Sequence, residues 1–131
     1  MNKYCKSVLL IDDNYIDNIL NTKILELTNF ASEIIAIQSI EDALEHISWT
    51  HKTNKSIPDF IFLDIRMPVN DGFNFIKSFE LMDDEIKKHA KIIMLTSSLA
   101  KEDESKALMN SYVKKFLSKP LTFESVELLK E

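Results

Sequence analysis

The chain has 131 residues, of which 45% are hydrophobic and 28% charged, and its formal net charge is −5. This length suits about one domain, the composition excludes a disordered or fibrous chain, and the acidic balance, with Arg66 as the only arginine, argues against nucleic-acid binding. No apolar stretch approaches the roughly 20 residues of a membrane span, so we expect no membrane segment. The single cysteine, Cys5, cannot form an internal disulfide, which suits a reducing compartment. We therefore expect a cytoplasmic protein.

Short apolar runs alternate with amphipathic segments in the first half of the chain. A continuous apolar run of four residues is typical of a buried parallel strand, whereas apolar residues at intervals of three and four indicate a helix. Ser39 has acidic residues in the turn after it and is therefore predicted to begin a helix. The predicted order is strand 8–11, helix 16–27, strand 34–37, helix from 39, loop 52–58 and strand 60–63.

The second half of the chain continues the same alternation. A helix opens near 70–72, a strand follows at 92–95, a charged helix at 101–110, a strand at 115–118, and a last helix after Thr122 that carries Phe123, Val126 and Leu129. Five strands alternating with five helices predict an α/β fold in which helices cover both faces of a parallel sheet. We expect a single domain over residues 1–131.

Polar residues stand where four of the predicted strands end, and in such a sheet ligands bind outside the carboxyl ends of the strands. The residues are Asp12 and Asp13 after the first strand, Asp64 after the third, Thr96 after the fourth, and Lys119 with Pro120 after the fifth. Taken singly, an aspartate here is usually a loop or cap residue and a lysine a solvated surface residue. Together they predict three carboxylates, a hydroxyl and an ammonium at one edge.

These groups indicate phosphoryl chemistry beside a metal ion. Crowded carboxylates repel each other and favour a bound cation, and Mg²⁺ prefers oxygen ligands of this kind. A carboxylate can also act as a nucleophile and form an acyl phosphate, while a metal, a lysine and a hydroxyl neutralise the moving phosphoryl oxygens. We interpret Asp71 as a helix cap and Asp17 as a helix-surface residue.

Four segments in order resemble two-component response-regulator receiver domains of the CheY-like family. They are VLLIDDN (8–14), IFLDIRMPVNDG (61–72), IIMLTSS (92–98) and FLSKP (116–120), and the resemblance runs from about Ser7 to the C-terminus. It implies a flavodoxin-like, doubly wound sheet with strand order 2-1-3-4-5. Because the chain stops with the last predicted helix, we expect a stand-alone receiver domain without an output domain.

The resemblance also implies roles for individual residues at the acidic end of the sheet. Asp64 would be the phospho-acceptor, and Mg²⁺ would be held by Asp12, Asp13, Asp64 and the backbone carbonyl of Arg66. The Arg66 side chain, two residues after the acceptor, would reach over the phosphoryl group and alter its lifetime. A solvent-exposed arginine without such a role is the alternative.

On the other side of the site, Thr96 and Lys119 would bind the phosphoryl group. Thr96 and Phe116 would form the switch, and Lys119 would precede Pro120 through a cis peptide bond. Asn110 stands before the fifth strand, where the family usually has glycine, and asparagine can adopt the left-handed conformation in its place.

The function implied by this resemblance is signalling rather than catalysis on a separate substrate. A sensor histidine kinase or a histidine phosphotransfer protein would phosphorylate Asp64, and the domain would catalyse only its own phosphorylation and dephosphorylation. A downstream protein would bind the face of the fourth helix, fifth strand and fifth helix, although the charged run 101–104 also suits a solvated helix start.

Two alternative functions remain to be distinguished. A magnesium-dependent phosphatase with an aspartyl nucleophile would carry a second aspartate two residues after the first, where this chain has Arg66. A scaffold that has lost phosphorylation would lack magnesium affinity, and the complete set of acidic, hydroxyl and ammonium groups argues against it.

Overall fold

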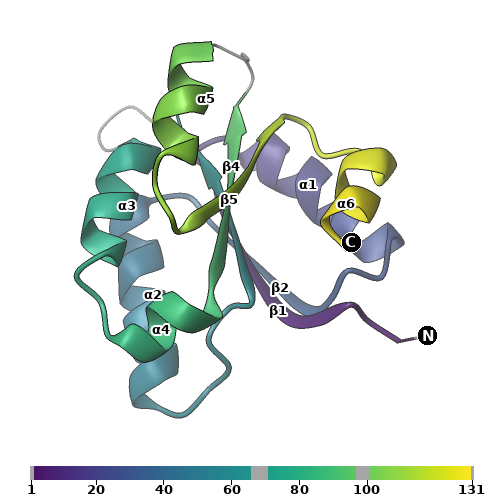
Figure 1. The fold of residues 1–131 in the computed structure, drawn as a ribbon. Coiled ribbons are helices and arrows are strands. Elements are labelled where there is room, and N and C mark those ends of the chain that lie inside the picture. Colours follow the sequence, from purple (N-terminus) through teal and green to yellow (C-terminus); the bar gives the residue numbers. More distant parts are fainter. Residues whose placement is uncertain (1, 66–70, 97–100, 131) are drawn as a thin grey trace.

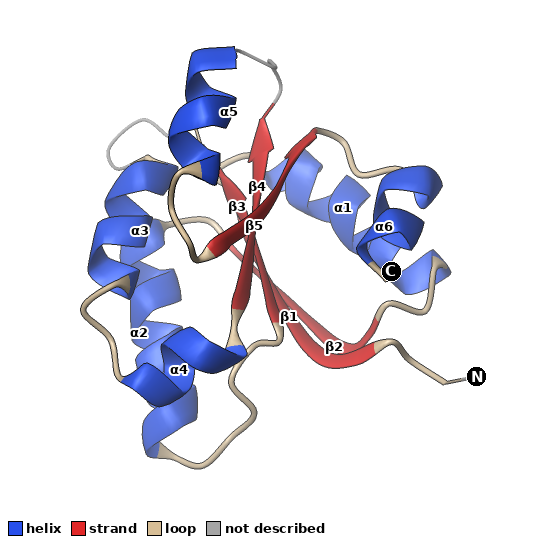
Figure 2. Cartoon of the chain, in the orientation of Figure 1, coloured by secondary structure: helices blue, strands red, loops and turns tan. Residues whose placement is uncertain are grey.

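The computed structural model describes residues 2–65, 71–96 and 101–130, and in it a five-stranded parallel sheet lies between two layers of helices (Figures 1 and 2). The strands are β1 (Cys5–Ile11), β2 (Ala31–Ile37), β3 (Phe60–Asp64), β4 (Lys91–Thr96) and β5 (Val113–Ser118). The helices are α1 (Tyr15–Leu27), α2 (Ile40–Lys52), α3 (Gly72–Phe79), α4 (Asp84–His89), α5 (Lys101–Leu108) and α6 (Phe123–Leu129). The strand order β2-β1-β3-β4-β5 confirms the predicted fold class.

The described residues contain six helices rather than the expected five, because α4 forms between α3 and β4. This helix has six residues and buries one hydrophobic side chain, Ile86. A segment so short shows too few apolar positions for a helical period to be recognised in the sequence. Its addition leaves the order and direction of the strands unchanged.

The register of the sheet brings the ends of the strands to one edge. Ile11 of β1 pairs with Leu63 of β3, and Thr96 of β4 pairs with Ser118 of β5. All four pairs of neighbouring strands are parallel. Asp12, Asp64 and Lys119, which follow Ile11, Leu63 and Ser118, therefore lie together with Thr96 at the carboxyl edge.

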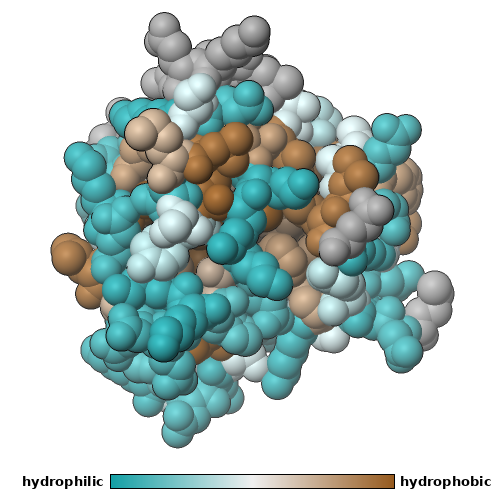
Figure 3. Space-filling model, in the orientation of Figure 1, coloured by the Kyte–Doolittle hydropathy of each residue, from teal (hydrophilic) through white to brown (hydrophobic). Residues whose placement is uncertain are grey.

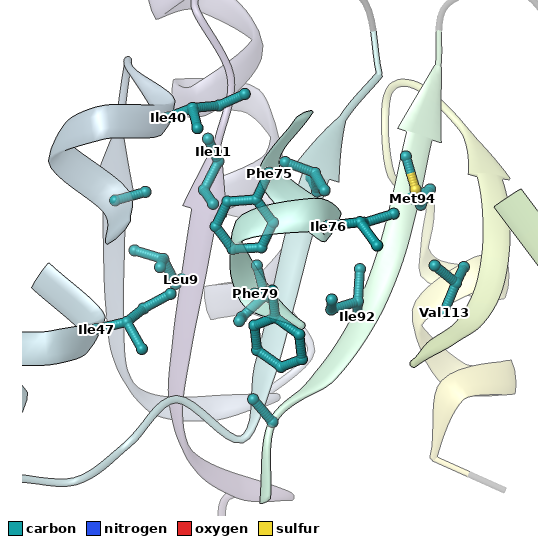
Figure 4. Packing of buried hydrophobic residues seen from close by; sticks show 14 of the residues in the cluster. Leu9, Ile11, Ile40, Ile47, Phe75, Ile76, Phe79, Ile92, Met94 and Val113 are labelled. Atoms are coloured by element: carbon teal, nitrogen blue, oxygen red, sulfur yellow. The ribbon is translucent and has the colours of Figure 1, made fainter. Parts of the chain in front are cut away.

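Two hydrophobic clusters hold the helices against the sheet. Along β1, Leu9 and Ile11 point into the cluster beneath α2, α3, α4 and α5, whereas Val8 and Leu10 point into the cluster beneath α1 and α6. This is the two-residue alternation of a strand buried on both faces. Figure 4 shows the first cluster, with the labelled residues Leu9, Ile11, Ile40, Ile47, Phe75, Ile76, Phe79, Ile92, Met94 and Val113. Full burial of each such side chain contributes about 1.5–3 kcal/mol.

Helix α1 departs from the hydrophobic pattern that predicts it. Its buried residues are Asn18, Asn21 and Leu25. Its exposed residues include Ile16, Ile19, Leu20 and Leu27, which are 46–58% exposed. The apolar spacing therefore identifies the helix correctly but marks a face that is turned to solvent. Similarly, in α6 Val126 and Leu129 are buried, whereas Phe123 is 54% exposed.

The helix starts follow the predicted capping residues. The Ser39 side chain accepts a hydrogen bond at the start of α2, and Asp71 and Thr122 form capping boxes at α3 and α6. The idea that Asn110 adopts a left-handed conformation is wrong, because positive φ angles occur in the described non-glycine residues only at Asn29 and Asn54.

No helix in the described part of the chain has the length and apolar character needed to cross a bilayer.

Candidate functional site

Three carboxylates meet at the carboxyl edge of the sheet. Asp12 and Asp13 follow β1 and Asp64 ends β3, and one oxygen of each lies within 4.8 Å of the others. Asp12 and Asp64 are each 3% exposed, whereas Asp13 is exposed. Buried carboxylates that face an exposed one form a site with oxygen ligands and open access, which fits a Mg²⁺ ion that keeps some of its water.

The turn from β1 into α1 fixes the position of Asp12. Its Oδ1 accepts the backbone N–H of Asn14 at 2.9 Å, and its backbone oxygen accepts the Asn18 side-chain amide at 3.0 Å. Asn14 in turn caps α1 by accepting the N–H of Asp17. Burial raises the pKa of Asp12, while the hydrogen bonds from Asn14 and Lys119 partly offset this effect.

The ammonium of Lys119 lies among acidic side chains. Its Nζ is 2.9 Å from Asp12 Oδ2, 2.8 Å from Asp17 Oδ2 and 3.5 Å from Asp64 Oδ2. Burial alone lowers the pKa of Lys119, but the hydrogen bonds to Asp17 and Asp12 and the charge of Asp64 outweigh burial and raise it. Lys119 is therefore a fixed positive charge beside Asp64.

The backbone around Lys119 is tied to two other elements. The Lys119 N–H donates to the Thr96 carbonyl at 2.7 Å, and the Lys119–Pro120 peptide bond is cis. Two residues later, the N–H of Leu121 donates to Asn21 Oδ1 at 2.9 Å, and Asn21 is a buried residue of α1. These bonds connect the ends of β4 and β5 to α1 and hold the lysine at the acidic edge.

The remaining predicted site residues lie nearby or deeper in the fold. Thr96 ends β4 and is 2% exposed, and it follows Leu95, the residue that pairs with Asp64. Phe116 of β5 is 9% exposed and packs in the cluster beneath α2 to α5. Arg66, expected to contribute a carbonyl and a side chain, lies outside the described residues.

Two residues of the site were missed by sequence reasoning. Asp17 lies on the partly exposed surface of α1, as predicted, but it also belongs to the site, because it makes the shortest contact with Lys119. Gly72, in the stretch 70–72 that is predicted to open a helix, also lies against the acceptor, since a Cβ atom there would lie 2.9 Å from the Asp64 carbonyl oxygen. The signal for Gly72 was its rarity, since it is the only glycine in the chain.

Comparisons with known proteins show which family the chain is similar to. A family model described as the response regulator receiver domain matches residues 8–130. The chain is 28% identical over 128 residues to the probable methanogenesis regulatory protein FilR2 of Methanothrix harundinacea, covering 95% of this chain and 81% of that protein. It is 29% identical over 125 residues to the polar-differentiation response regulator DivK of Brucella ovis, covering 93% and 94%. A solved two-component response regulator from Cytophaga hutchinsonii superposes with a TM-score of 0.90 at 34% identity, over 98% of this chain and 95% of that one.

Proposed function

Because the chain belongs to the response regulator receiver domain family, we propose that it acts as a stand-alone, phosphorylation-dependent switch in the cytoplasm. A sensor histidine kinase or a histidine phosphotransfer protein supplies the phosphoryl group, and Asp64 accepts it. The observation that supports this most strongly is the buried Asp64 carboxylate with two further carboxylates and the Lys119 ammonium around it.

The transfer step follows from the chemistry of a carboxylate nucleophile. An oxygen of Asp64 attacks the phosphorus of the donor phosphohistidine, so that a P–O bond forms while the P–N bond breaks and its electron pair stays on the imidazole nitrogen. Dephosphorylation restores the free carboxylate: water attacks the phosphorus, the bond to Asp64 breaks, and inorganic phosphate is released. Both steps modify this domain itself.

The surrounding residues stabilise the charge that moves in these steps. Asp12, Asp13 and Asp64 would hold Mg²⁺, which when bound neutralises part of the charge on the phosphoryl oxygens. Lys119, whose Nζ lies 3.5 Å from Asp64 Oδ2, supplies a further positive charge. The hydroxyl of Thr96 donates a hydrogen bond to the phosphoryl group, since Thr96 ends the strand beside β3.

The switch couples this site to a partner surface through Thr96 and Phe116. Phosphorylation shifts the population between two packings of these side chains, and both residues are buried on the neighbouring strands β4 and β5. The output face consists of α5, β5 and α6, the elements that correspond to the predicted fourth helix, fifth strand and fifth helix. Figure 3 views this side and shows hydrophobic residues among hydrophilic ones.

The exposed apolar residues of α1 support a docking place for the phosphodonor. Ile16, Ile19 and Leu20 are 46–58% exposed on α1, which begins at Tyr15, shortly after Asp13. A donor that covers these side chains would stand next to the acidic edge, where its phosphohistidine must approach Asp64. Helix α6 lies beside α1 on the same side of the sheet (Figure 1), and its Phe123 is also exposed.

Binding of beryllofluoride, which imitates a phosphoryl group on a carboxylate, tests this function without a cognate kinase. We expect the protein with Mg²⁺ to bind beryllofluoride, and the Asp64→Asn variant to lose this binding. Calorimetry measures both. If the wild-type protein shows neither magnesium nor beryllofluoride affinity, the scaffold alternative is correct.

A further inference from the structure

Lys119 is held more closely by Asp17 than by the phospho-acceptor. Its Nζ lies 2.8 Å from Asp17 Oδ2, a hydrogen-bond distance, and 3.5 Å from Asp64 Oδ2, beyond a good hydrogen bond. Asp17 lies outside the group of three carboxylates that could hold a metal ion. It belongs to the first turn of α1, 102 residues away from Lys119 along the chain.

The Asp17 carboxylate is well placed to hold the ammonium. Its own backbone N–H donates to Asn14 Oδ1 at 3.0 Å, which fixes the first turn of α1, and a negative charge is favourable at this end of a helix. The Lys119 side chain is 9% exposed and that of Asp17 29%, so solvent screens this pair only partly. The bond therefore draws the lysine toward α1.

From this geometry we propose that Asp17 is a positioning residue that restrains Lys119 in the unphosphorylated protein and competes with the phosphoryl group on Asp64 for its charge. The inference rests on the proposed function. For Lys119 to approach a phosphoryl group, its 2.8 Å bond to Asp17 must lengthen or break. The negative charge of Asp17 also repels the incoming phosphoryl oxygens.

The same charge has the opposite effect on a metal ion. Without Asp17, the positive charge of Lys119 would be balanced by fewer carboxylates and would repel a cation more strongly. Asp17 therefore favours Mg²⁺ and opposes the phosphoryl group. A residue with only a structural role would change both affinities in the same direction or neither of them.

The substitution Asp17→Asn separates these possibilities because it keeps the shape of the side chain and removes its charge. We expect calorimetry to show about threefold weaker binding of Mg²⁺ alone and about threefold tighter binding of beryllofluoride at saturating Mg²⁺, as suits a partly exposed charge. The Asp17→Glu variant keeps the charge and should bind Mg²⁺ as the wild type does. Thermal denaturation of each variant reports whether it is folded.

Asp42→Asn is the matched control. Asp42 occupies the same position in the first turn of α2, where its N–H donates to the Ser39 cap at 3.1 Å, and its side chain is exposed. This variant should leave both affinities unchanged.

The outcomes distinguish the inference from the proposed function. If Asp17→Asn weakens both ligands together, or changes neither, while the wild type binds beryllofluoride through Asp64, the competition is wrong and the proposed function stands. If the wild type fails to bind beryllofluoride, or Asp64→Asn binds it equally well, the proposed function is wrong. The proposed role of Asp17 is then wrong too, because it requires a phosphoryl group on Asp64.

Discussion

Gly72, the first residue of α3, packs directly against the backbone of Asp64. A Cβ atom on Gly72 would lie 2.9 Å from the Asp64 carbonyl oxygen and 2.9 Å from the Met94 side chain. In addition, the Gly72 N–H donates to the carbonyl of Ile65, the residue after the acceptor, at 2.9 Å. The close approach of α3 to the end of β3 therefore depends on the absence of a side chain at this position.

Replacing Gly72 by alanine should displace Asp64. Helix propensity alone favours alanine by up to about 1 kcal/mol, whereas overpacking against a backbone oxygen costs about 1–3 kcal/mol. We expect a net loss in the free energy of unfolding, measured by urea denaturation, together with weaker beryllofluoride binding. Lys77→Ala, an exposed change on the same helix, should affect neither. A more stable Gly72→Ala variant with normal binding would disprove the contact.

Asp13→Asn should separate metal binding from stability. It removes one of three crowded carboxylates, so the metal-free protein should unfold at the same temperature as the wild type or higher. A Mg²⁺ concentration 100 times the wild-type dissociation constant stabilises the wild type by about 2.7 kcal/mol, and a variant with tenfold weaker affinity by only about 1.4 kcal/mol. Thermal denaturation with and without Mg²⁺ measures this difference. Equal stabilisation of both proteins would exclude Asp13 as a ligand.

Asn21→Ala should destabilise the fold although Asn21 is a polar residue on α1. The substitution leaves the buried N–H of Leu121 without its acceptor, and such a loss costs about 1–3 kcal/mol. Urea denaturation measures the change in the free energy of unfolding. Lys23→Ala, an exposed change on the same helix, is the control. Equal stability of the two variants would mean that the bond from Leu121 contributes nothing.

Cys5 should react slowly with alkylating reagents in the folded protein. Burial raises the pKa of the Cys5 thiol from 9.0 to about 12, and the charge of Asp59 adds to this effect. Because only the thiolate reacts, its rate at pH 8 should be far below that of an unfolded control in urea. Mass spectrometry after timed iodoacetamide treatment follows the reaction. Similar rates in the folded and unfolded protein would show that the thiol is not protected.

The strands and the acidic edge could be predicted from the sequence because both depend on local patterns. Apolar runs such as 8–11 and 60–63 mark buried strands, and topology alone carries Asp12, Asp13 and Asp64 to one edge. A family resemblance added the order of the strands.

The role of Asp17 and the orientation of α1 could not be predicted in this way. Whether Asp17 meets Lys119 depends on the packing of α1 beside the turn after β5, which no local pattern encodes. Hydrophobic periodicity also predicts that Asn18 and Asn21 lie on the surface, because both are polar. Their side-chain amides are buried instead, and each forms a hydrogen bond with a backbone group of another segment. Buried polar residues with hydrogen bonds are stable inside a fold.

Phosphorylation of the protein by a small phosphodonor tests whether Asp64 accepts a phosphoryl group. We incubate the protein with acetyl phosphate and Mg²⁺ and measure its mass before and after alkaline treatment, which hydrolyses acyl phosphates. We expect the mass of one added phosphoryl group that requires Mg²⁺, is removed by alkali, and is absent in Asp64→Asn but present in Asp42→Asn. An unmodified wild-type protein, or an Asp64→Asn variant modified to the same extent, would contradict it.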